Sequence, residues 1–509
     1  MKFKIDDSKR FMVLVESTEL EYSQIESSFT KKKDNWYILK KKSPYAKTEE
    51  KFIDQYNRVP CGLWREVQKL SSKYKFPLEI EGIEYLYNKD FDESEFIEWV
   101  NTYFENSEKK PRDYQIEAAV RILKYRNCVE EVATSGGKTL IAFMIFKYLL
   151  NKKIINKMLY VVPHIDLVNQ TEEEFYSYED DCGFKPTWKS ECIFGGSKKE
   201  KENINIVFGT YQSLVKKDLD YFSKFDIVCV DESHHTRCQS IKTIIVKTYN
   251  TKYKFGMTGT LPKESSCDSF TVQSYLGPKV YELRSDDLIA AGNATPVNVV
   301  GIELDYLEEE LKKKLYNLRN VSADEKDGAK LLNLEKDILR ANRKRFNYIC
   351  ETVAKSTKNS LVLFADIKNE YGRSIYDWLR ENTEKTVYYI DGATKNDNRD
   401  YYKKQMEEQE NTIIVASVGV FSEGINLINL HNIFIVESQK SEYQIRQILG
   451  RGMRLKEDKE QLTVVDFRDN FIYGAHKFQR INYLMRHSIE RERIYKDRGF
   501  PFKSFKVKL

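Results

Sequence analysis

The stretch Cys128-Val-Glu-Glu-Val-Ala-Thr-Ser-Gly-Gly-Lys-Thr139 decides the fold of this chain. A strand-like segment, residues 128–132, runs into a glycine-bearing turn, and an apolar helix is expected from about Thr139 to Leu150. Other short apolar runs downstream also end in polar or glycine-bearing turns. Because such runs are typical of parallel strands buried on both faces, the chain is predicted to be an α/β protein.

Two sets of apolar runs predict two parallel sheets in series. The first set comprises residues 158–162, 204–208 and 226–230. The second set comprises residues 361–364, 387–390, 412–415, 433–436 and 462–465. Ahead of both sheets, residues 11–15 and 36–39 are predicted strands, and residues 63–73 and 92–100 are predicted amphipathic helices. The predicted domains are a small α+β N-terminal domain (1–105), a first lobe (106–302), a helical connector (303–346), a second lobe (347–470) and a C-terminal extension, helical and then extended (471–509).

Size and composition exclude some classes of protein. A chain of 509 residues is too long for one ordinary core, and 41% hydrophobic with 32% charged residues is a globular rather than a disordered profile. The 83 basic and 78 acidic residues nearly balance, so any nucleic-acid contact must come from local patches. Eight cysteines without a Cys-x-x-Cys pair predict free thiols in a reducing compartment. With no signal-like N-terminus and no long apolar stretch, we expect a cytoplasmic protein without membrane contact.

The glycine-bearing turn has the residues of a phosphate-binding loop. Glycines let successive backbone N–H groups approach phosphates, and the helix that follows adds its positive N-terminal end. Lys138 would neutralise the outer phosphates of ATP, and the Thr139 hydroxyl would ligate Mg²⁺. The pattern departs from G-x-x-x-x-G-K-[ST] because Val132 replaces its first glycine, so a chance turn is the alternative. The candidate nucleotide-binding residues here are Thr134, Ser135, Gly136, Gly137, Lys138 and Thr139.

A second candidate is the acid pair Asp231-Glu232, which directly follows the apolar run 227–230. That position is the carboxyl end of a predicted strand, where ligands bind in open α/β sheets. Asp231 would hold Mg²⁺, and Glu232 would orient or deprotonate the attacking water. A structural cap between strand and helix is the alternative for the pair. His234, in Asp-Glu-Ser-His-His, is predicted to relay between nucleotide and nucleic acid.

A third candidate is Gln447-x-x-Gly450-Arg451-x-x-Arg454. The charge that develops on the γ-phosphate needs cations, and such arginines are worth roughly 10³–10⁵ in rate in comparable enzymes. Arg451 and Arg454 are expected one helical turn apart, projecting together. A surface helix with salt bridges is the alternative. The predicted catalytic residues are Lys138, Asp231, Glu232, Gln447, Arg451 and Arg454.

In order and spacing these segments resemble superfamily 2 helicases of the DExH type, over about residues 110–470. The resemblance implies two tandem RecA-like parallel-sheet lobes, ATP hydrolysis with Mg²⁺ and coupling to nucleic acid. Pro111-Arg112-Asp113-Tyr114-Gln115 is similar to the adenine-reading segment, and the segment around Glu423-Gly424-Ile425-Asn426 to motif V. The additional cofactor-binding residues that it implies are Arg112, Gln115, Gly424 and Asn426. The implied nucleic-acid-coupling residues are His164, Thr210, His234, Thr258, Thr260 and Ser417.

The ends of the chain resemble the UvsW-type phage helicases. The similar segments are residues 54–64 and 480–491. This resemblance implies a DNA helicase that acts on forks, Holliday junctions and R-loops in recombination, repair and replication. Its implied partners are single-stranded and branched DNA, RNA–DNA hybrids as a further substrate, and recombination or replication proteins. A monomer in the host cytoplasm is expected, and the family suggests 3′-to-5′ polarity.

The N-terminal region and the rival functions stay open on sequence alone. Lys31–Lys33 and Lys40–Lys42 flank Trp36 and Tyr37, which suits a phosphate-binding and base-stacking surface or, equally, solvated lysines around a small core. The rival functions are an RNA helicase, a double-stranded DNA translocase that does not separate strands, and an annealing or binding protein without enzyme activity. Against the first, the chain lacks Asp-Glu-Ala-Asp; against the last, the six predicted catalytic residues are intact.

Overall fold

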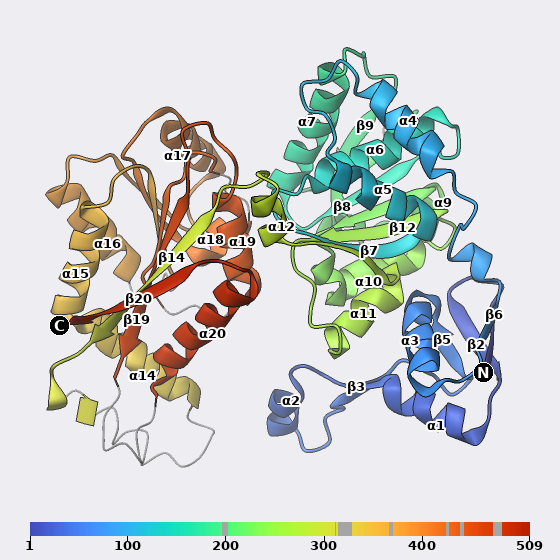
Figure 1. Cartoon of the computed structure of the whole chain (residues 1–509), viewed down its shortest axis with the longest axis horizontal. Helices are drawn as coiled ribbons and strands as arrows, with labels where there is room; N and C mark the ends of the chain where they lie inside the picture. The colour runs from blue at the N-terminus through green and yellow to red at the C-terminus, as the bar shows by residue number, and fades with distance from the viewer. Residues whose placement is uncertain are drawn as a thin grey trace. The chain divides into compact units, whose positions relative to one another are not determined.

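The computed structural model describes residues 1–195, 202–310, 312–313, 328–365, 370–423, 427–437, 442–471 and 481–509. The chain forms two compact units, Met1–Leu283 and Arg284–Leu509 (Figure 1). None of the helices in these described segments is both long enough and apolar enough to cross a bilayer.

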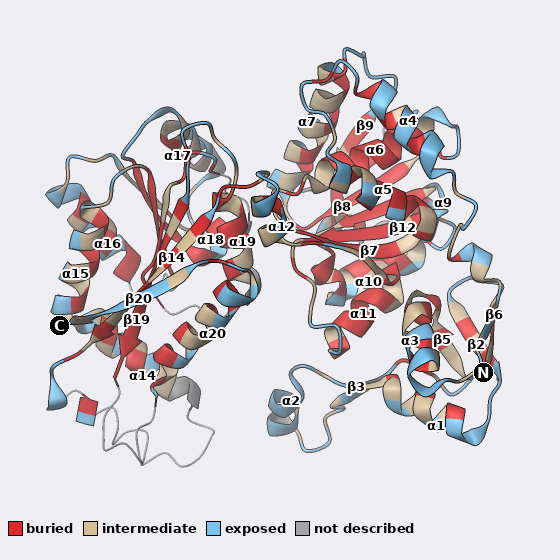
Figure 2. Cartoon of the chain, viewed as in Figure 1, coloured by how far each residue is buried: buried red, intermediate tan, exposed pale blue. Residues whose placement is uncertain are grey.

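The first unit is built on a seven-stranded sheet in the order β13-β7-β12-β11-β8-β10-β9. Every neighbouring pair in it is parallel, which confirms the predicted α/β class. Apart from the edge strand β13, in which only Leu283 is buried, the strands are almost entirely buried, as parallel strands covered on both faces must be (Figure 2). Their bounds are Asn127–Val132 (β7), Met158–Val162 (β8), Ser190–Ile193 (β9), Ile206–Thr210 (β10), Ile227–Asp231 (β11), Tyr253–Thr258 (β12) and Lys279–Leu283 (β13).

Helices cover both faces of this sheet (Figure 1). Helix α6 (Lys138–Asn151) is buried from Leu140 to Leu149, because its sequence is apolar all round. Its one internal cation, Lys147, is buried and pairs with the buried carboxylate of Glu179. The other helices of this lobe are α5 (Asp113–Tyr125), α7 (Ile165–Asp181), α8 (Tyr211–Leu214), α9 (Leu219–Ser223), α10 (Gln239–Lys247) and α11 (Cys267–Leu276), with the 3₁₀ turn η3 (Ser233–Arg237).

The N-terminal region has its own four-stranded sheet in the order β5-β2-β1-β6 and a separate β3–β4 pair. It packs against helix α11 of the same unit, where the rings of Phe29 and Phe52 lie 5.9 and 5.4 Å from that of Phe270. Its elements are β1 (Lys2–Ile5), β2 (Phe11–Glu16), α1 (Glu19–Ser28), β3 (Thr30–Lys32), α2 (Trp36–Lys42), β4 (Glu49–Lys51), β5 (Arg58–Pro60), η1 (Cys61–Leu63), α3 (Trp64–Tyr74), β6 (Glu79–Glu81), η2 (Ile83–Tyr85) and α4 (Glu93–Tyr103).

One predicted strand in this region is wrong. Residues 36–39 form the first turn of helix α2, not a strand. Aromatic and aliphatic residues favoured a strand there, but the flanking segments β3 and β4 pair with each other and leave this segment no strand to join. Trp36 and Tyr37 are 41% and 52% exposed on the helix, so packing did not impose the strand conformation either.

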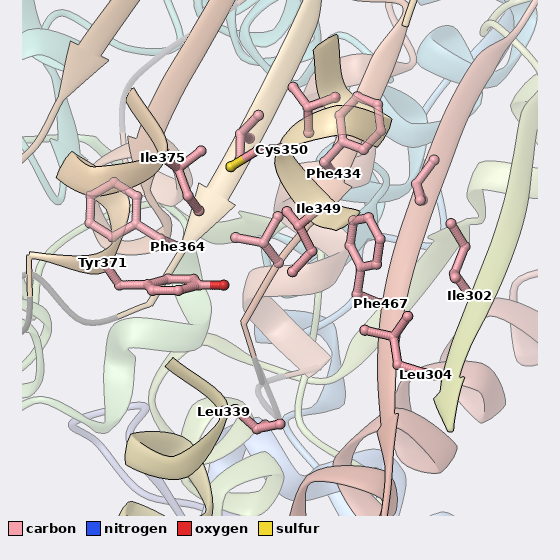
Figure 3. Close-up of a cluster of buried hydrophobic side chains, with 14 of the residues drawn as sticks. Ile302, Leu304, Leu339, Ile349, Cys350, Phe364, Tyr371, Ile375, Phe434 and Phe467 are labelled. Carbon is pink, nitrogen blue, oxygen red and sulfur yellow. The ribbon is translucent and has the colours of Figure 1, made fainter. Parts of the chain in front are cut away.

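The second unit is also built on a seven-stranded parallel sheet, in the order β16-β17-β15-β18-β19-β14-β20. Ile349 of α15, Ile375 of α16 and Phe467 of β19 lie in one buried apolar cluster (Figure 3). The strands are β14 (Val297–Asp305), β15 (Ser360–Phe364), β16 (Val387–Ile390), β17 (Ile413–Ser417), β18 (Asn432–Ile435), β19 (Leu462–Asn470) and β20 (Phe502–Lys508). The helices are α12 (Ser285–Ala290), α14 (Gly328–Ala341), α15 (Arg343–Ala354), α16 (Tyr371–Asn382), α17 (Asn396–Glu408), α18 (Val418–Glu423), α19 (Glu442–Gly452) and α20 (Tyr483–Asp497).

The observed division of the chain differs from the predicted domain boundaries. Strand β14, placed mostly in the first lobe by the predicted boundary at 302, pairs along its whole length with β19 of the second sheet. The predicted C-terminal extension supplies β20, which pairs with the other edge of β14. The second sheet therefore draws strands from both ends of its unit, which local sequence patterns do not reveal. Much of the predicted connector, residues 311 and 314–327, lies outside the described residues.

Candidate active site

The predicted site residues of the first unit gather at one edge of its sheet. Because the strands are parallel, their carboxyl ends meet at the same edge. The phosphate-loop sequence follows β7, Thr258 ends β12, Asp231 ends β11 and Thr210 ends β10. His164 follows β8 and caps the start of α7. Thr134 and Thr258, which are 124 positions apart in sequence, are thus placed on one rim.

The loop between β7 and α6 has the backbone of an anion cradle. Gly137 caps α6 with φ of +78°, a conformation that suits glycine, and no side chain caps the helix. The N–H groups of its first turn therefore have no intrahelical partner and point out of the helix toward the loop. Gly136 is tightly enclosed, since a Cβ there would lie 2.6 Å from Val132 Cγ1. This backbone fits a phosphate ligand.

Gln115 supports the loop from α5. Its side-chain amide donates from Nε2 to the carbonyl oxygen of Gly136 at 3.1 Å, and its Oε1 accepts from the Arg112 N–H at 2.9 Å. Gln115 is buried, whereas Arg112 is exposed and its Nη1 donates to the Tyr114 hydroxyl. Gln115 thus touches the loop directly and holds it in place, whereas Arg112 contacts Gln115 and Tyr114.

Lys138 and Glu232 form the charged centre of the rim. Lys138 Nζ lies 3.7 Å from Glu232 Oε1, and both side chains are largely buried. Burial alone would raise the pKa of Glu232, but the charge of Lys138 and the hydrogen bonds from His234 and Thr258 hold that pKa below its ordinary value. Glu232 is therefore an ionised acceptor, as a residue that orients water must be.

Asp231 differs from its neighbour in its surroundings. Burial, and next the negative charge of Glu232, raise the pKa of Asp231 to about 6. Its Oδ1 accepts a hydrogen bond from the Glu232 N–H at 2.8 Å. A carboxylate and the Thr139 hydroxyl are both hard oxygen ligands, the kind that Mg²⁺ takes. The donor set at this edge therefore fits the predicted metal.

Thr258 joins the acids to the segment Thr258-Gly259-Thr260. Its Oγ1 lies 3.2 Å from Glu232 Oε2 and 2.9 Å from His234 Nδ1, and it accepts from the Thr260 N–H at 3.3 Å. Thr258, His234 and Thr260 are all buried. A Cβ on Gly259 would lie 3.2 Å from Thr134 Oγ1, so this segment also packs on the phosphate loop.

Two predicted coupling residues lie farther along the rim. Thr210 is buried, and its Oγ1 lies 3.1 Å from Ser213 Oγ, within the turn that starts α8. His164 is half-buried at the start of α7. The Gln212 side chain donates to the carbonyl oxygen of Pro163 at 3.2 Å, which ties these two segments together. Both segments are held in place and reach the same edge as the acids.

The remaining predicted residues belong to the second unit. Ser417 ends β17 and is buried, and its hydroxyl has no hydrogen-bond partner among the residues that the structure describes. Gln447 is buried on α19, and Arg451 Nη1 donates to the Phe421 carbonyl oxygen at 2.5 Å. Gly424 and Asn426 lie outside the described residues. The structure thus brings Arg451 against α18, next to the predicted motif V.

The predicted helical spacing of the two arginines is wrong. Helix α19 ends at Gly452, so Arg454 lies beyond it and not one turn above Arg451. Buried Lys459 ends the helix by donating to the carbonyl oxygens of Gly452 and Arg454, and Thr295 Oγ1 also donates to the latter at 2.9 Å. Sequence reasoning missed Lys459 and Thr295. A lysine shortly after a helix end was a usable signal, whereas Thr295 lies 159 positions away.

Comparison with known proteins agrees with this geometry. Residues 108–263 match the family described as type III restriction enzyme, res subunit, and residues 344–456 match the helicase conserved C-terminal domain. The chain is 29% identical over 466 residues to the ATP-dependent DNA helicase uvsW of Enterobacteria phage T4, covering 88% of each protein. It is 26% identical over 374 residues to the DNA 3′-5′ translocase XPB2 of Sulfurisphaera tokodaii, covering 69% of this chain and 80% of that protein.

A solved structure supports the fold. The fragment structure of a putative HsdR subunit of a type I restriction enzyme from Vibrio vulnificus aligns with a TM-score of 0.54 at 18% identity, covering 82% of this chain and 72% of that one. With two RecA-like sheets, the phosphate-loop and Asp-Glu-Ser-His segments on one rim and matches to two helicase-type families, the chain is similar to the superfamily 2 helicases of the DExH type. Within that superfamily it is similar to the UvsW-type phage helicases.

Proposed function

We propose that this chain is an ATP-dependent DNA helicase or translocase that remodels forks, Holliday junctions and R-loops in recombination, repair and replication. The observation that carries the proposal is the contact of Lys138 with Glu232, at 3.7 Å, joined through Thr258 to His234. This arrangement places a phosphate-neutralising cation, a water-orienting carboxylate and a coupling segment on one rim. The UvsW and XPB2 relatives, both named for action on DNA, support DNA as the substrate.

ATP is the nucleotide that the proposed enzyme hydrolyses, and we assign the groups of this chain that bind it. The phosphates would lie on the N–H groups of the loop 134–139, with Lys138 on the outer ones, and Arg112 and Gln115 would contact the base. In the second unit, Gly424 and Asn426 are assigned to the nucleotide, and Gln447, Arg451 and Arg454 to the phosphates. Mg²⁺, held by Thr139 and Asp231, would supply positive charge that stabilises the leaving phosphates.

Coupling to nucleic acid is assigned to the rest of the rim. Glu232 orients water beside the nucleotide, and its contact with Thr258 lets the segment 258–260 sense the state of that carboxylate. His164, Thr210 and, in the second unit, Ser417 are assigned to contacts with the strand. Cycles of ATP binding and release would then alter the grip on nucleic acid.

We also propose that the region 1–105 contacts nucleic acid and that the enzyme works as a monomer in the cytoplasm, of the host if the chain is viral. Lys32 lies 5.5 Å from the ring of exposed Trp36, a cation-and-aromatic arrangement that suits a strand. Recombination or replication proteins are proposed partners, and RNA–DNA hybrids a further substrate.

A second candidate is favoured by the match of residues 108–263 to the restriction-enzyme family. It is an ATP-driven double-stranded DNA translocase that does not separate strands. The deciding experiment measures ATP hydrolysis and strand displacement on forks, four-way junctions, R-loops, linear duplex and RNA duplex. Strand displacement on branched DNA supports the helicase, hydrolysis stimulated by linear duplex without displacement supports the translocase, and displacement confined to RNA would overturn both. Binding without hydrolysis would indicate an annealing protein.

A further inference from the structure

A large cavity lies at the opposite edge of the first sheet from the candidate active site. Its volume is about 800 Å³, within the range of small-ligand sites. Asn127, at the amino end of β7, lines it, whereas the phosphate loop follows the carboxyl end of that strand. Five residue steps of about 3.3 Å separate the two ends by about 16 Å. The cavity is therefore distinct from the ATP site.

The walls come from the N-terminal sheet on one side and from α10, α11 and the start of β12 on the other. Eight cationic side chains and four carboxylates line the cavity. Four of the cations pair with acids, namely Arg58 with Asp54, Lys33 with Glu50, Lys51 with Glu26 and Arg237 with Asp268. The other four are Lys9, Arg10, Lys242 and Lys254, which form no ion pair with the described carboxylates.

Lys254 and Arg10 influence each other across this cavity. Burial, and next the positive charge of Arg10, lower the pKa of Lys254 to about 8. Two like charges that line one cavity repel each other. An anion bound beside Arg10 and Lys254 would relieve that repulsion.

Aromatic rings lie beside two of these four cations, Arg10 and Lys242, and beside the paired Arg58. Arg10 lies 5.7 Å and Arg58 5.0 Å from the ring centre of Phe11, and Lys242 lies 5.6 Å from that of Tyr275. Both rings are half-buried in the cavity wall. Cations beside partly open aromatic rings are the elements that bind a phosphate and stack a base.

We infer that this cavity is a second nucleotide-binding site, which takes a phosphate on Arg10, Lys242 and Lys254 and a base against Phe11 or Tyr275. The nucleotide is either one unit of a nucleic-acid strand or a free mononucleotide. Binding of a nucleic-acid strand rests on the proposed function, because the cavity would then be part of the path of that strand. Binding of a free mononucleotide does not rest on the proposed function.

The test compares the full chain with Arg10→Gln, Lys242→Gln and their double variant. Arg10 is exposed and Lys242 half-buried, so neither change removes core packing. Lys185→Gln, an exposed change in the loop after α7, is the matched control. Binding of fluorescent 12-mer oligothymidylate and of dTMP is measured without ATP at several salt concentrations, beside unstimulated ATP hydrolysis.

If the cavity binds a strand, the double variant should bind oligothymidylate about tenfold more weakly than the wild type. The slope of log affinity against log salt concentration should be shallower by roughly 0.7 per lost phosphate contact. Unstimulated ATP hydrolysis should keep the wild-type rate. For a free nucleotide, only dTMP affinity should fall tenfold. Affinities for both probes equal to the control would overturn the inference. The binding measurements omit ATP, so they do not depend on the proposed function. Failure of nucleic acid to stimulate ATP hydrolysis would defeat the proposed function but would leave these binding results valid.

Protection of the Lys254 amine from acylation is a second test of the inference, and it needs no variant. Acylating reagents attack the neutral amine, and a pKa of about 8 leaves much of Lys254 neutral at pH 8. The probe that binds the cavity should slow acylation of Lys254 severalfold, measured by mass spectrometry, and leave Lys185 unaffected. Equal acylation of Lys254 with and without both probes would also overturn the inference.

Discussion

The Oγ1 hydroxyl of Thr258 lies 3.2 Å from Glu232 Oε2 and so connects the ends of strands β12 and β11. The same oxygen lies 2.9 Å from His234 Nδ1. A hydroxyl has one hydrogen to donate, and an ionised carboxylate can only accept. If Thr258 donates to Glu232, His234 must donate from Nδ1 to Thr258. The two contacts give the acid and the segment 258–260 a direct link.

Replacing Thr258 by valine tests this link. Thr258→Val keeps the shape but removes the hydroxyl, so we expect nucleic-acid-stimulated ATP hydrolysis to fall about tenfold, the equivalent of one hydrogen bond of ~1.4 kcal/mol. Unstimulated hydrolysis should fall less, and the ratio of the two rates is the measurement. Thr243→Val, which removes an exposed hydroxyl on α10, is the control. An unchanged ratio would show that Thr258 does not couple.

Lys138→Ala tests the phosphate loop. The change removes the only charge of the loop 134–139, so nucleic-acid-stimulated ATP hydrolysis should be abolished. Glu232 would also lose its counter-charge, and its pKa should rise. Steady-state phosphate release is the measurement, and Lys185→Ala is the control. A variant with most of its turnover intact would remove Lys138 from the site.

Glu232→Gln separates binding from turnover. The amide keeps the size of the side chain but cannot accept a proton, so we expect ATP affinity within about threefold of the wild type and a turnover at least 100-fold lower. Equilibrium binding of a fluorescent ATP analogue and the turnover rate are both measured. Normal turnover would take the water-orienting role away from Glu232.

Gly137→Ala tests the shape of the loop against a control with the same backbone. Gly137 and Gly183 have φ of +78° and +76°, but an added Cβ would lie 2.0 Å from Gln115 Nε2 at the first and meets nothing within 4 Å at the second. Gly183→Ala therefore reports left-handed strain alone, about 1 kcal/mol. Gly137→Ala should lose that stability and also weaken ATP binding at least tenfold, because Gln115 must move. Equal ATP affinity in both variants would contradict the contact.

Local patterns predicted the parts of this structure that depend on neighbours in sequence. The apolar run 227–230 followed by Asp231 and Glu232 predicted the strand and the position of the two acids at its carboxyl end, because parallel strands deliver their last residues to one rim. Contacts over long distances were invisible. Nothing near β14 shows that it pairs with β19 and β20, and nothing near Arg454 shows that Thr295 holds its carbonyl oxygen. Segment 36–39 has strand-like composition but no partner strand, and there tertiary context decided.

Glu130 gives a stability prediction that turns on pH. It is fully buried in β7, and neither carboxylate oxygen has a hydrogen-bond partner among the described residues. Burial raises its pKa well above the ordinary 4.5, so the folded chain keeps a proton there that the unfolded chain releases. Because the folded state then binds more protons, its stability must fall as pH rises above about 4.5, until the folded pKa is reached.

Glu130→Met removes that titration together with the cost of an unsatisfied buried polar group. We expect the variant to be more stable than the wild type by roughly 1–3 kcal/mol at pH 8, with a smaller difference at pH 5. Urea denaturation at the two pH values is the measurement, and Glu98→Met, an exposed change on α4, should show neither effect. A stability difference that does not change between pH 5 and pH 8 would mean that Glu130 is not protonated in the folded chain. In that case β7 carries an ionised carboxylate four residues before Thr134 of the phosphate loop, and a cation or water must reach that carboxylate from the rim.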